Sequence, residues 1–185
     1  MKRFLLILTA AASLAFCDTA AAQEPPQFPG PEKEHQWLQQ FVGQWETEAT
    51  ASMGPDQPPM ECKGTMNARM LGGFWLLSES KAEPAGMPMN ALQTIGYDPA
   101  KQKYVGTWVD SMMNHLWLYE GSVDATGKIL TLEAEGPNMM AEGKLTKFRD
   151  TYEFKSADHI VSTSSMRDES GKWVTFMTGH CKRKP

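Results

Sequence analysis

Cysteine is scarce in this sequence, which has three in 185 residues. Only Cys62 and Cys181 lie beyond the N-terminal signal peptide predicted below. An oxidising compartment would permit a disulfide between them. Two separate buried thiols are the alternative, because a disulfide needs Cα atoms within ~7 Å and the sequence does not give that distance.

Positive charge is also scarce and dispersed. The net charge is −4, and no basic cluster is longer than the terminal run 182–184. Nucleic-acid binding normally requires a basic patch, so we predict no nucleic-acid partner.

The usual motifs of metal sites and of nucleophilic catalysis are missing. The four histidines are isolated and form no His-x-His or His-Glu-x-x-His pattern, so zinc is not predicted. The methionines, 13 in all, are scattered and indicate adaptable packing rather than copper ligation. There is no Gly-x-Ser-x-Gly and no phosphate-binding glycine loop.

No apolar run is long enough to span a bilayer, which takes ~20 residues. The longest, residues 4–16, follows Lys2 and Arg3 and precedes three alanines that end at Ala22. This order is typical of a secretory signal peptide with cleavage after Ala22. A lipoprotein site at Cys17 is the competing interpretation, but the bulky Phe16 disfavours it. We therefore expect an exported protein, periplasmic or extracellular, that is soluble and has no stable membrane anchor.

After the signal peptide, residues 1–22, the sequence predicts a Pro-rich leader at 23–31 and one domain at 32–185. Apolar side chains at helical spacing predict one short helix over 32–41, ended by Gly43. The rest consists of short β-branched and aromatic segments between turn signals. The predicted strands are 45–51, 60–70, 73–81, 91–97, 103–110, 115–123, 128–134, 146–155, 159–166 and 172–182.

Consecutive hairpins without a βαβ pattern predict an all-β fold. A meander of about ten antiparallel strands generally closes to remove its edges. We therefore predict an up-and-down β-barrel whose short N-terminal helix closes one end. The helix runs into Gly43 and Trp45, which resembles the opening of calycin barrels such as lipocalins, fatty-acid carriers and nitrobindin-like haem proteins.

Several longer strings carry a family resemblance. They are Pro-Gly-Pro-Glu at 29–32 with His35, Trp37 and Leu38; Met-Leu-Gly-Gly-Phe-Trp at 70–75; Ile-Gly-Tyr-Asp-Pro at 95–99; Gly-Thr-Trp at 106–108; Ser-Met-Met at 111–113; His-Leu-Trp at 115–117; Tyr-Glu-Gly at 119–121; Leu-Thr-Leu at 130–132; and Phe-Arg-Asp at 148–150. Together they resemble domain-of-unknown-function family 1579, bacterial proteins that are often exported. The resemblance implies one calycin-like (lipocalin-like) domain and no established reaction.

The segment 104–121 predicts one wall of a binding site. With a two-residue turn at 112–113, cross-strand partners are Asp110 with His115, Trp108 with Trp117, and Gly106 with Tyr119. Alternation places all six on one face. A face with two tryptophans, a tyrosine and a His–carboxylate pair suits a mostly apolar ligand wall. Core packing and a surface for association are the alternatives.

Three further positions complete the candidate site. We expect Trp75 to contribute to the wall, and an inward pair of Glu79 and Arg149 could bind a polar head group, because an isolated buried ion is too costly. Solvated surface charges are the alternative for both. The calycin resemblance implies one cofactor option, a haem held by His180 on the last strand. Otherwise we predict no cofactor and no metal.

Three functions follow from these features. The leading hypothesis is a barrel that binds a small apolar or amphipathic molecule. The second is a cavity enzyme, an isomerase or hydrolase, with His115 and Asp110 as an acid–base pair. The third is an envelope interaction protein whose barrel is filled by side chains. The sequence leaves the oligomeric state open.

The signal peptide gives a first test. Intact-mass measurement of the protein secreted by its native host should show a chain that begins at Gln23. A diacylated chain that begins at Cys17 would contradict this prediction.

Overall fold

The computed structural model describes residues 28–52, 58–138 and 143–185. The chain divides into two units, residues 1–30 and 31–185, and the second contains every helix and strand described below. The predicted signal peptide, Cys17 and most of the Pro-rich leader lie outside the described residues. In the described part of the chain, no helix is both long enough and apolar enough to cross a membrane.

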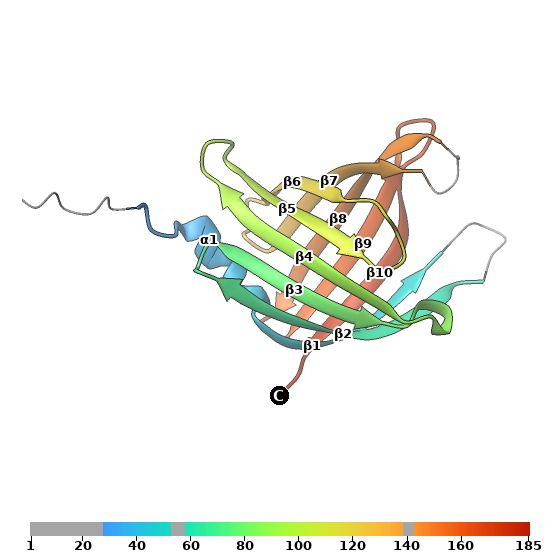
Figure 1. Cartoon of the computed structure of the whole chain (residues 1–185), viewed down its shortest axis with the longest axis horizontal. Coiled ribbons are helices and arrows are strands. Elements are labelled where there is room, and N and C mark those ends of the chain that lie inside the picture. Colours follow the sequence, from blue (N-terminus) through green and yellow to red (C-terminus); the bar gives the residue numbers. More distant parts are fainter. Residues whose placement is uncertain (1–27, 53–57, 139–142) are drawn as a thin grey trace, which may run out of the picture. The chain divides into compact units, whose positions relative to one another are not determined.

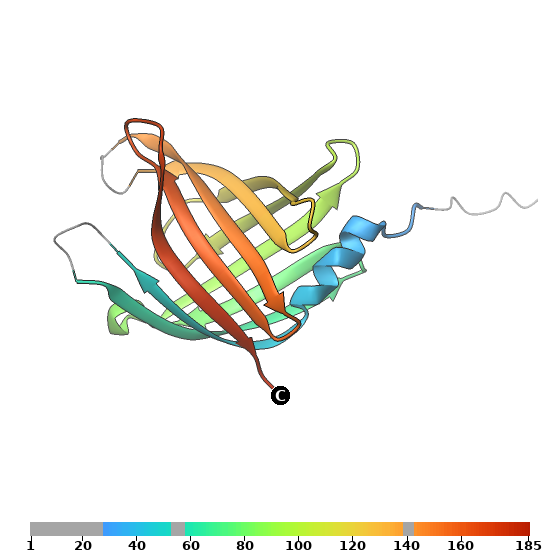
Figure 2. The ribbon, with the colours of Figure 1, turned by 180° about the vertical axis from the view of Figure 1, so that it is seen from behind.

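Ten antiparallel strands form one closed barrel in chain order, with β1 pairing to both β2 and β10 (Figures 1 and 2). The predicted all-β, up-and-down fold is therefore confirmed. The strands are β1 (Gly43–Ala51), β2 (Met60–Leu71), β3 (Trp75–Ala82), β4 (Met89–Asp98), β5 (Lys103–Asp110), β6 (Trp117–Val123), β7 (Ile129–Pro137), β8 (Leu145–Ser156), β9 (His159–Arg167) and β10 (Trp173–Arg183). A single-turn 3₁₀ helix, η2 (Pro84–Gly86), lies between β3 and β4.

The predicted helix is present as α1 (Lys33–Trp37) followed by the 3₁₀ helix η1 (Leu38–Phe41), and it lies at one end of the barrel (Figures 1 and 2). His35 fixes its start. The backbone N–H of Glu32 donates to His35 Nδ1 at 3.0 Å, so the proton is on Nε2, which lies 3.1 Å from the Tyr97 carbonyl oxygen. The Trp37 indole donates to the Gly127 carbonyl at 2.8 Å. These bonds tie the helix to the turns that surround this end.

The half of the barrel nearest the helix is a solid core. Trp45 is completely buried, its indole donates to the Phe41 carbonyl at 2.8 Å, and the Arg183 guanidinium lies 4.1 Å from its ring centroid. Other fully buried side chains around it are Leu38, Leu76, Ile95, Leu130, Leu132 and Ile160. The helix and this layer therefore form a closed floor.

Side-chain size differs between the walls above that floor. The ladder brings small residues inward on β1 to β4, including Ala49, Gly64, Ser78, Ser80 and Ala91. The facing strands β5, β6 and β8 carry large aromatic residues inward, namely Trp108, Trp117, Tyr119, Phe148 and Tyr152. Small residues opposite large ones leave room for either interdigitation or a cavity.

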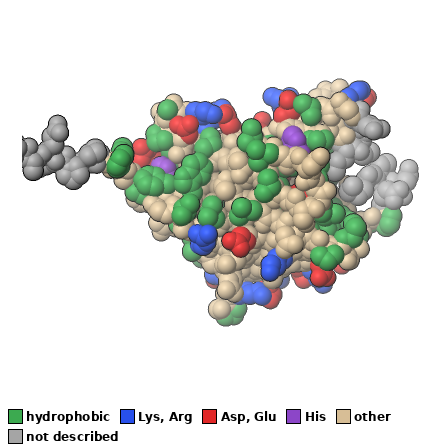
Figure 3. Space-filling model, in the orientation of Figure 1, with side chains coloured by type: hydrophobic (Ala, Val, Ile, Leu, Met, Phe, Trp, Pro, Cys, Tyr) green, Lys and Arg blue, Asp and Glu red, His purple; other side chains and the backbone are tan. Residues whose placement is uncertain are grey.

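The outer face of β3 to β6 is unusually apolar (Figure 3). Its exposed side chains include Trp75, Leu92, Val109 and Leu118, and Leu116 is exposed in the loop just before β6. The ladder explains this grouping, since Leu92 pairs with Val109 and Thr107 with Leu118.

The floor makes a testable contribution to stability. Trp45→Phe removes the donor to the Phe41 carbonyl and part of the stacking surface for Arg183, so we expect the free energy of unfolding to fall by about 1–3 kcal/mol. Trp75→Phe changes a 41% exposed tryptophan on the outer face and should cost less. Urea unfolding of both variants measures the difference. Equal losses would show that Trp45 has no special role.

Candidate functional site

A cavity of about 240 Å³ occupies the barrel interior on the far side of the core from the helix. Its walls are mostly aromatic or thioether, with a few polar groups. The lining residues are Trp108, Asp110, Met113, Trp117, Tyr119, Phe148, Asp150, Tyr152, Ser164, Phe176 and Met177.

The β5–β6 hairpin supplies the aromatic wall. Trp108 pairs with Trp117 and Gly106 with Tyr119, so the predicted register is confirmed. Gly106 is required here, because a Cβ atom would collide with the Thr94 carbonyl of β4. Glycine is also required at 136, where the Trp117 ring occupies the space of a side chain. Gly106 thus lets β4 and β5 approach closely, and Gly136 makes room for the Trp117 ring.

The predicted Asp110–His115 pair is wrong, because the hairpin loop is longer than two residues. β5 ends at Asp110 and β6 begins at Trp117. The Asp110 carboxylate instead accepts hydrogen bonds from the Trp108 indole at 2.9 Å and from the Met112 N–H at 2.8 Å. His115 Nε2 lies 3.2 Å from the Glu135 carbonyl oxygen. Asp110 therefore lines the cavity and caps the loop, whereas His115 is not a lining residue and packs edge-to-face on Trp117 with centroids 4.8 Å apart.

A second carboxylate, Asp150 on β8, lies deeper. Its two oxygens accept hydrogen bonds from the Tyr119 and Ser164 hydroxyls, both at 2.5 Å. Burial raises the pKa of the Asp150 carboxyl above its ordinary value, and the two hydroxyl donors offset only part of this shift. The side chain nevertheless has some accessible surface, because it borders the cavity.

Tyr152 adjoins this carboxylate and extends the polar group across the barrel. The Gln93 amide donates to the Tyr152 hydroxyl oxygen at 2.9 Å, which connects β4 to β8. Burial and the nearby Asp150 charge raise the pKa of Tyr152 and hold the phenol neutral. Its hydroxyl proton has no acceptor among the described residues and is available to an occupant.

A β-bulge on β10 adds two more lining residues. The ladder with β9 shifts between Thr175 and Met177, which leaves Phe176 as the extra residue. Phe176 packs edge-to-face on Phe148 with centroids 6.2 Å apart. Both Phe176 and Met177 consequently reach the cavity.

Three residues expected in the site lie on the outer face instead. Trp75 and Glu79 belong to the outward set of β3, where Leu76, Ser78 and Ser80 point inward. Arg149 is outward on β8, where it bonds to Glu133 at 2.6 Å and stacks on Trp173 at 4.0 Å. No inward Glu79–Arg149 pair forms. The inward and outward faces of β3 and β8 are therefore the reverse of those predicted.

Cys62 and Cys181 follow the second option that the sequence left open, separate thiols, and His180 does not lie where the haem option would need it. Cys62 and Cys181 are free thiols, and β1 separates their strands, since Cys62 pairs with Ala49 and Cys181 with Thr47. Burial raises the pKa of Cys181 to about 11. His180 is exposed on the outer face, next to His159, so it cannot hold a haem inside the barrel. Among the described residues, no group of three or more metal-ligating side chains is arranged to hold a metal ion.

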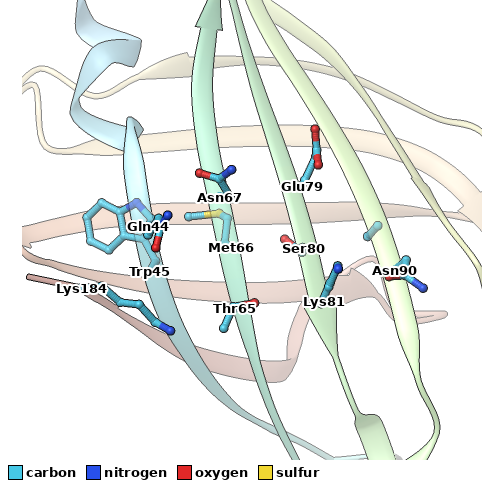
Figure 4. Close-up of a pocket in the computed structure, with 11 residues that line it drawn as sticks. Gln44, Trp45, Thr65, Met66, Asn67, Glu79, Ser80, Lys81, Asn90 and Lys184 are labelled. Carbon is cyan, nitrogen blue, oxygen red and sulfur yellow. The ribbon is translucent and has the colours of Figure 1, made fainter.

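A wider depression of about 390 Å³ lies over β1 to β4 (Figure 4). Most of its side chains belong to the outer face, including Asn67, Glu79, Lys81 and Lys184. They are polar or charged groups, whereas the walls of the barrel cavity are mostly aromatic or thioether. The barrel cavity is therefore the better candidate site.

These features define a class, a calycin-like antiparallel barrel with a closed floor and a cavity above it. The chain belongs to the family described as protein of unknown function DUF1579, whose model matches residues 30–183. No curated protein matches it.

Solved structures with a similar fold include Rv2717c from M. tuberculosis, with a TM-score of 0.61 and 15% identity over 84% of this chain and 99% of that one. The S-type phycobiliprotein lyase CPES from Guillardia theta has a TM-score of 0.52 and 12% identity over 86% of this chain and 99% of that one. At these identities the likeness concerns the fold alone.

The raised pKa of Asp150 predicts a pH dependence of stability. A carboxyl that is protonated more readily in the folded state stabilises the fold at low pH. That contribution is lost as the pH rises from about 4, the ordinary pKa of Asp, through the raised value. We therefore expect Asp150→Asn to become more stable relative to the wild type between pH 4 and pH 7. Thermal unfolding across this range measures the difference in stability. A change in the opposite direction would contradict a raised pKa for the Asp150 carboxyl.

Proposed function

We propose that this protein is an exported carrier that holds a small amphipathic molecule in the barrel cavity. The cavity carries the proposal, because it combines aromatic walls with hydrogen-bonding groups at its base. Pockets for small ligands are generally mostly apolar, with a few polar groups that fix orientation.

The arrangement of these side chains would orient a bound molecule. The apolar part would contact Trp108, Trp117 and Phe148, and the polar end would meet Asp150 and the free hydroxyl proton of Tyr152. Larger pockets of ~300–1,000 Å³ serve drug-sized ligands. A cavity of about 240 Å³ favours a smaller molecule, or one that protrudes from the open end.

The binding role has better support than the other two hypotheses. An acid–base enzyme built on His115 and Asp110 lacks its pair, since those side chains bond elsewhere. A filled barrel describes only the half next to the helix. Export is proposed from the sequence of the predicted signal peptide alone, residues 1–22.

The proposal is tested with 2-phenylethanol, a small neutral amphipathic probe. We expect saturable binding by isothermal titration calorimetry and about tenfold weaker binding by Trp108→Leu, a loss of roughly 1.4 kcal/mol. Trp75→Leu is the matched control, because this tryptophan lies on the outer face and its loss should leave the affinity unchanged.

Native mass spectrometry of protein purified from its host provides a second readout. A retained small molecule in the wild type, absent from Trp108→Leu, would support the proposal. Failure to retain any molecule, together with no binding of the probe, would refute it.

A further inference from the structure

The described charged side chains that line the cavity are all of one sign, negative. Of its described lining residues, Asp110 and Asp150 carry carboxylates and none is a lysine, arginine or histidine. The nearest cation in sequence, Arg149, points outward to Glu133. Arg183 is used at the helix end, where it bonds to the carbonyls of Gln40 and Val42. The interior above the floor therefore has negative charge and no counter-charge of its own.

Asp150 differs from the other paired carboxylates of the protein. Glu120, for comparison, contacts both Lys101 and Lys103 on the outer surface, at 2.6 and 2.9 Å. Asp150 has two neutral hydroxyl donors and no cation within salt-bridge distance among the described residues. A buried charge without a partner is costly, and an apolar side chain of similar size would be more favourable for stability. The carboxylate is thus placed at a cost that a positively charged occupant would offset.

A second polar group of the interior, the Ser78 hydroxyl, lacks a hydrogen-bond partner among the described residues. The Ser78 side chain is buried. It faces inward beside Gln93, its ladder partner, whose amide is bonded to Tyr152. The interior therefore contains an unpaired hydroxyl and an uncompensated carboxylate on opposite sides of the Gln93–Tyr152 bond.

The walls around Asp150 suit a cation as well. Trp117, Phe148 and Phe176 border the same cavity, and aromatic faces attract ammonium groups through their negative quadrupole. Trp117 and Phe148 meet edge-to-face with centroids 4.8 Å apart, so the planes of their rings are nearly perpendicular.

We propose that the cavity selects a small organic cation, an aryl- or alkylammonium whose charged nitrogen meets Asp150 between the aromatic walls. This inference rests on the proposed binding function and specifies the class of ligand. A neutral occupant would leave the carboxylate uncompensated, and an anion would be repelled by both Asp150 and Asp110.

Three probes of similar size test the sign of the charge: protonated 2-phenylethylamine, 2-phenylethanol and phenylacetate, titrated at pH 7.5 by calorimetry. We expect the ammonium to bind at least tenfold more tightly than the alcohol, and phenylacetate to show no binding. In Asp150→Asn the preference for the ammonium over the alcohol should fall by about tenfold. A cooperative thermal unfolding transition like that of the wild type shows that the variant is folded.

Glu79→Gln is the matched control. It removes one negative charge from the outer face and should leave the preference unchanged. If it lowers the preference as much as Asp150→Asn, the effect is one of net charge and the inference is wrong.

The outcomes separate the two proposals. If the alcohol binds as tightly as the ammonium, the barrel is a carrier but its cavity does not select a cation. If phenylacetate binds best, the sign of the inference is reversed and it is overturned. If none of the three binds and no molecule is retained from the host, the proposed function itself fails.

Discussion

The pairing of β1 with β10 is the constraint on which the rest of the molecule depends. It joins the first strand to the last through partners that run from Trp45 opposite Arg183 to Ala51 opposite Met177. A closed ladder has no free edge, so every strand is held on both sides. Closure also fixes which face of each strand points inward, because shifting a strand by one residue would expose its entire apolar set. The cavity and the floor both follow from this fixed alternation.

Closure brings together residues that are far apart in sequence. Tyr119, Asp150 and Ser164 come from β6, β8 and β9, and Gln93 on β4 reaches Tyr152. Side chains that are unremarkable one by one become a connected polar group because the barrel turns them toward a common interior. Burial then changes their chemistry, as the raised pKa values of Asp150 and Tyr152 show.

Much of this architecture could be predicted from the sequence. All ten strands and the helix were predictable from turn signals and local patterns, and the pairing of Trp108 with Trp117 followed from the hairpin. The inward face of β3 was not predictable, and that of β8 was predicted wrongly although its sequence carries the signal. Around Trp75 the odd and the even positions are both apolar, from Phe74 to Leu77, so the pattern does not indicate which face of the strand points inward. On β8, Phe148, Tyr152 and Phe154 are all even-numbered, a signal that indicates an inward Asp150 and an outward Arg149.

The bulge on β10 has a consequence for the shape of the site. A regular strand offers every second side chain to the interior, so its contributions are spaced by two residues. The extra residue at Phe176 puts two consecutive side chains, an aromatic ring and the thioether of Met177, on the same stretch of wall. This part of the wall therefore carries two bulky side chains where a regular strand would place one, and the molecules that fit the cavity are sorted by outline as well as by polarity.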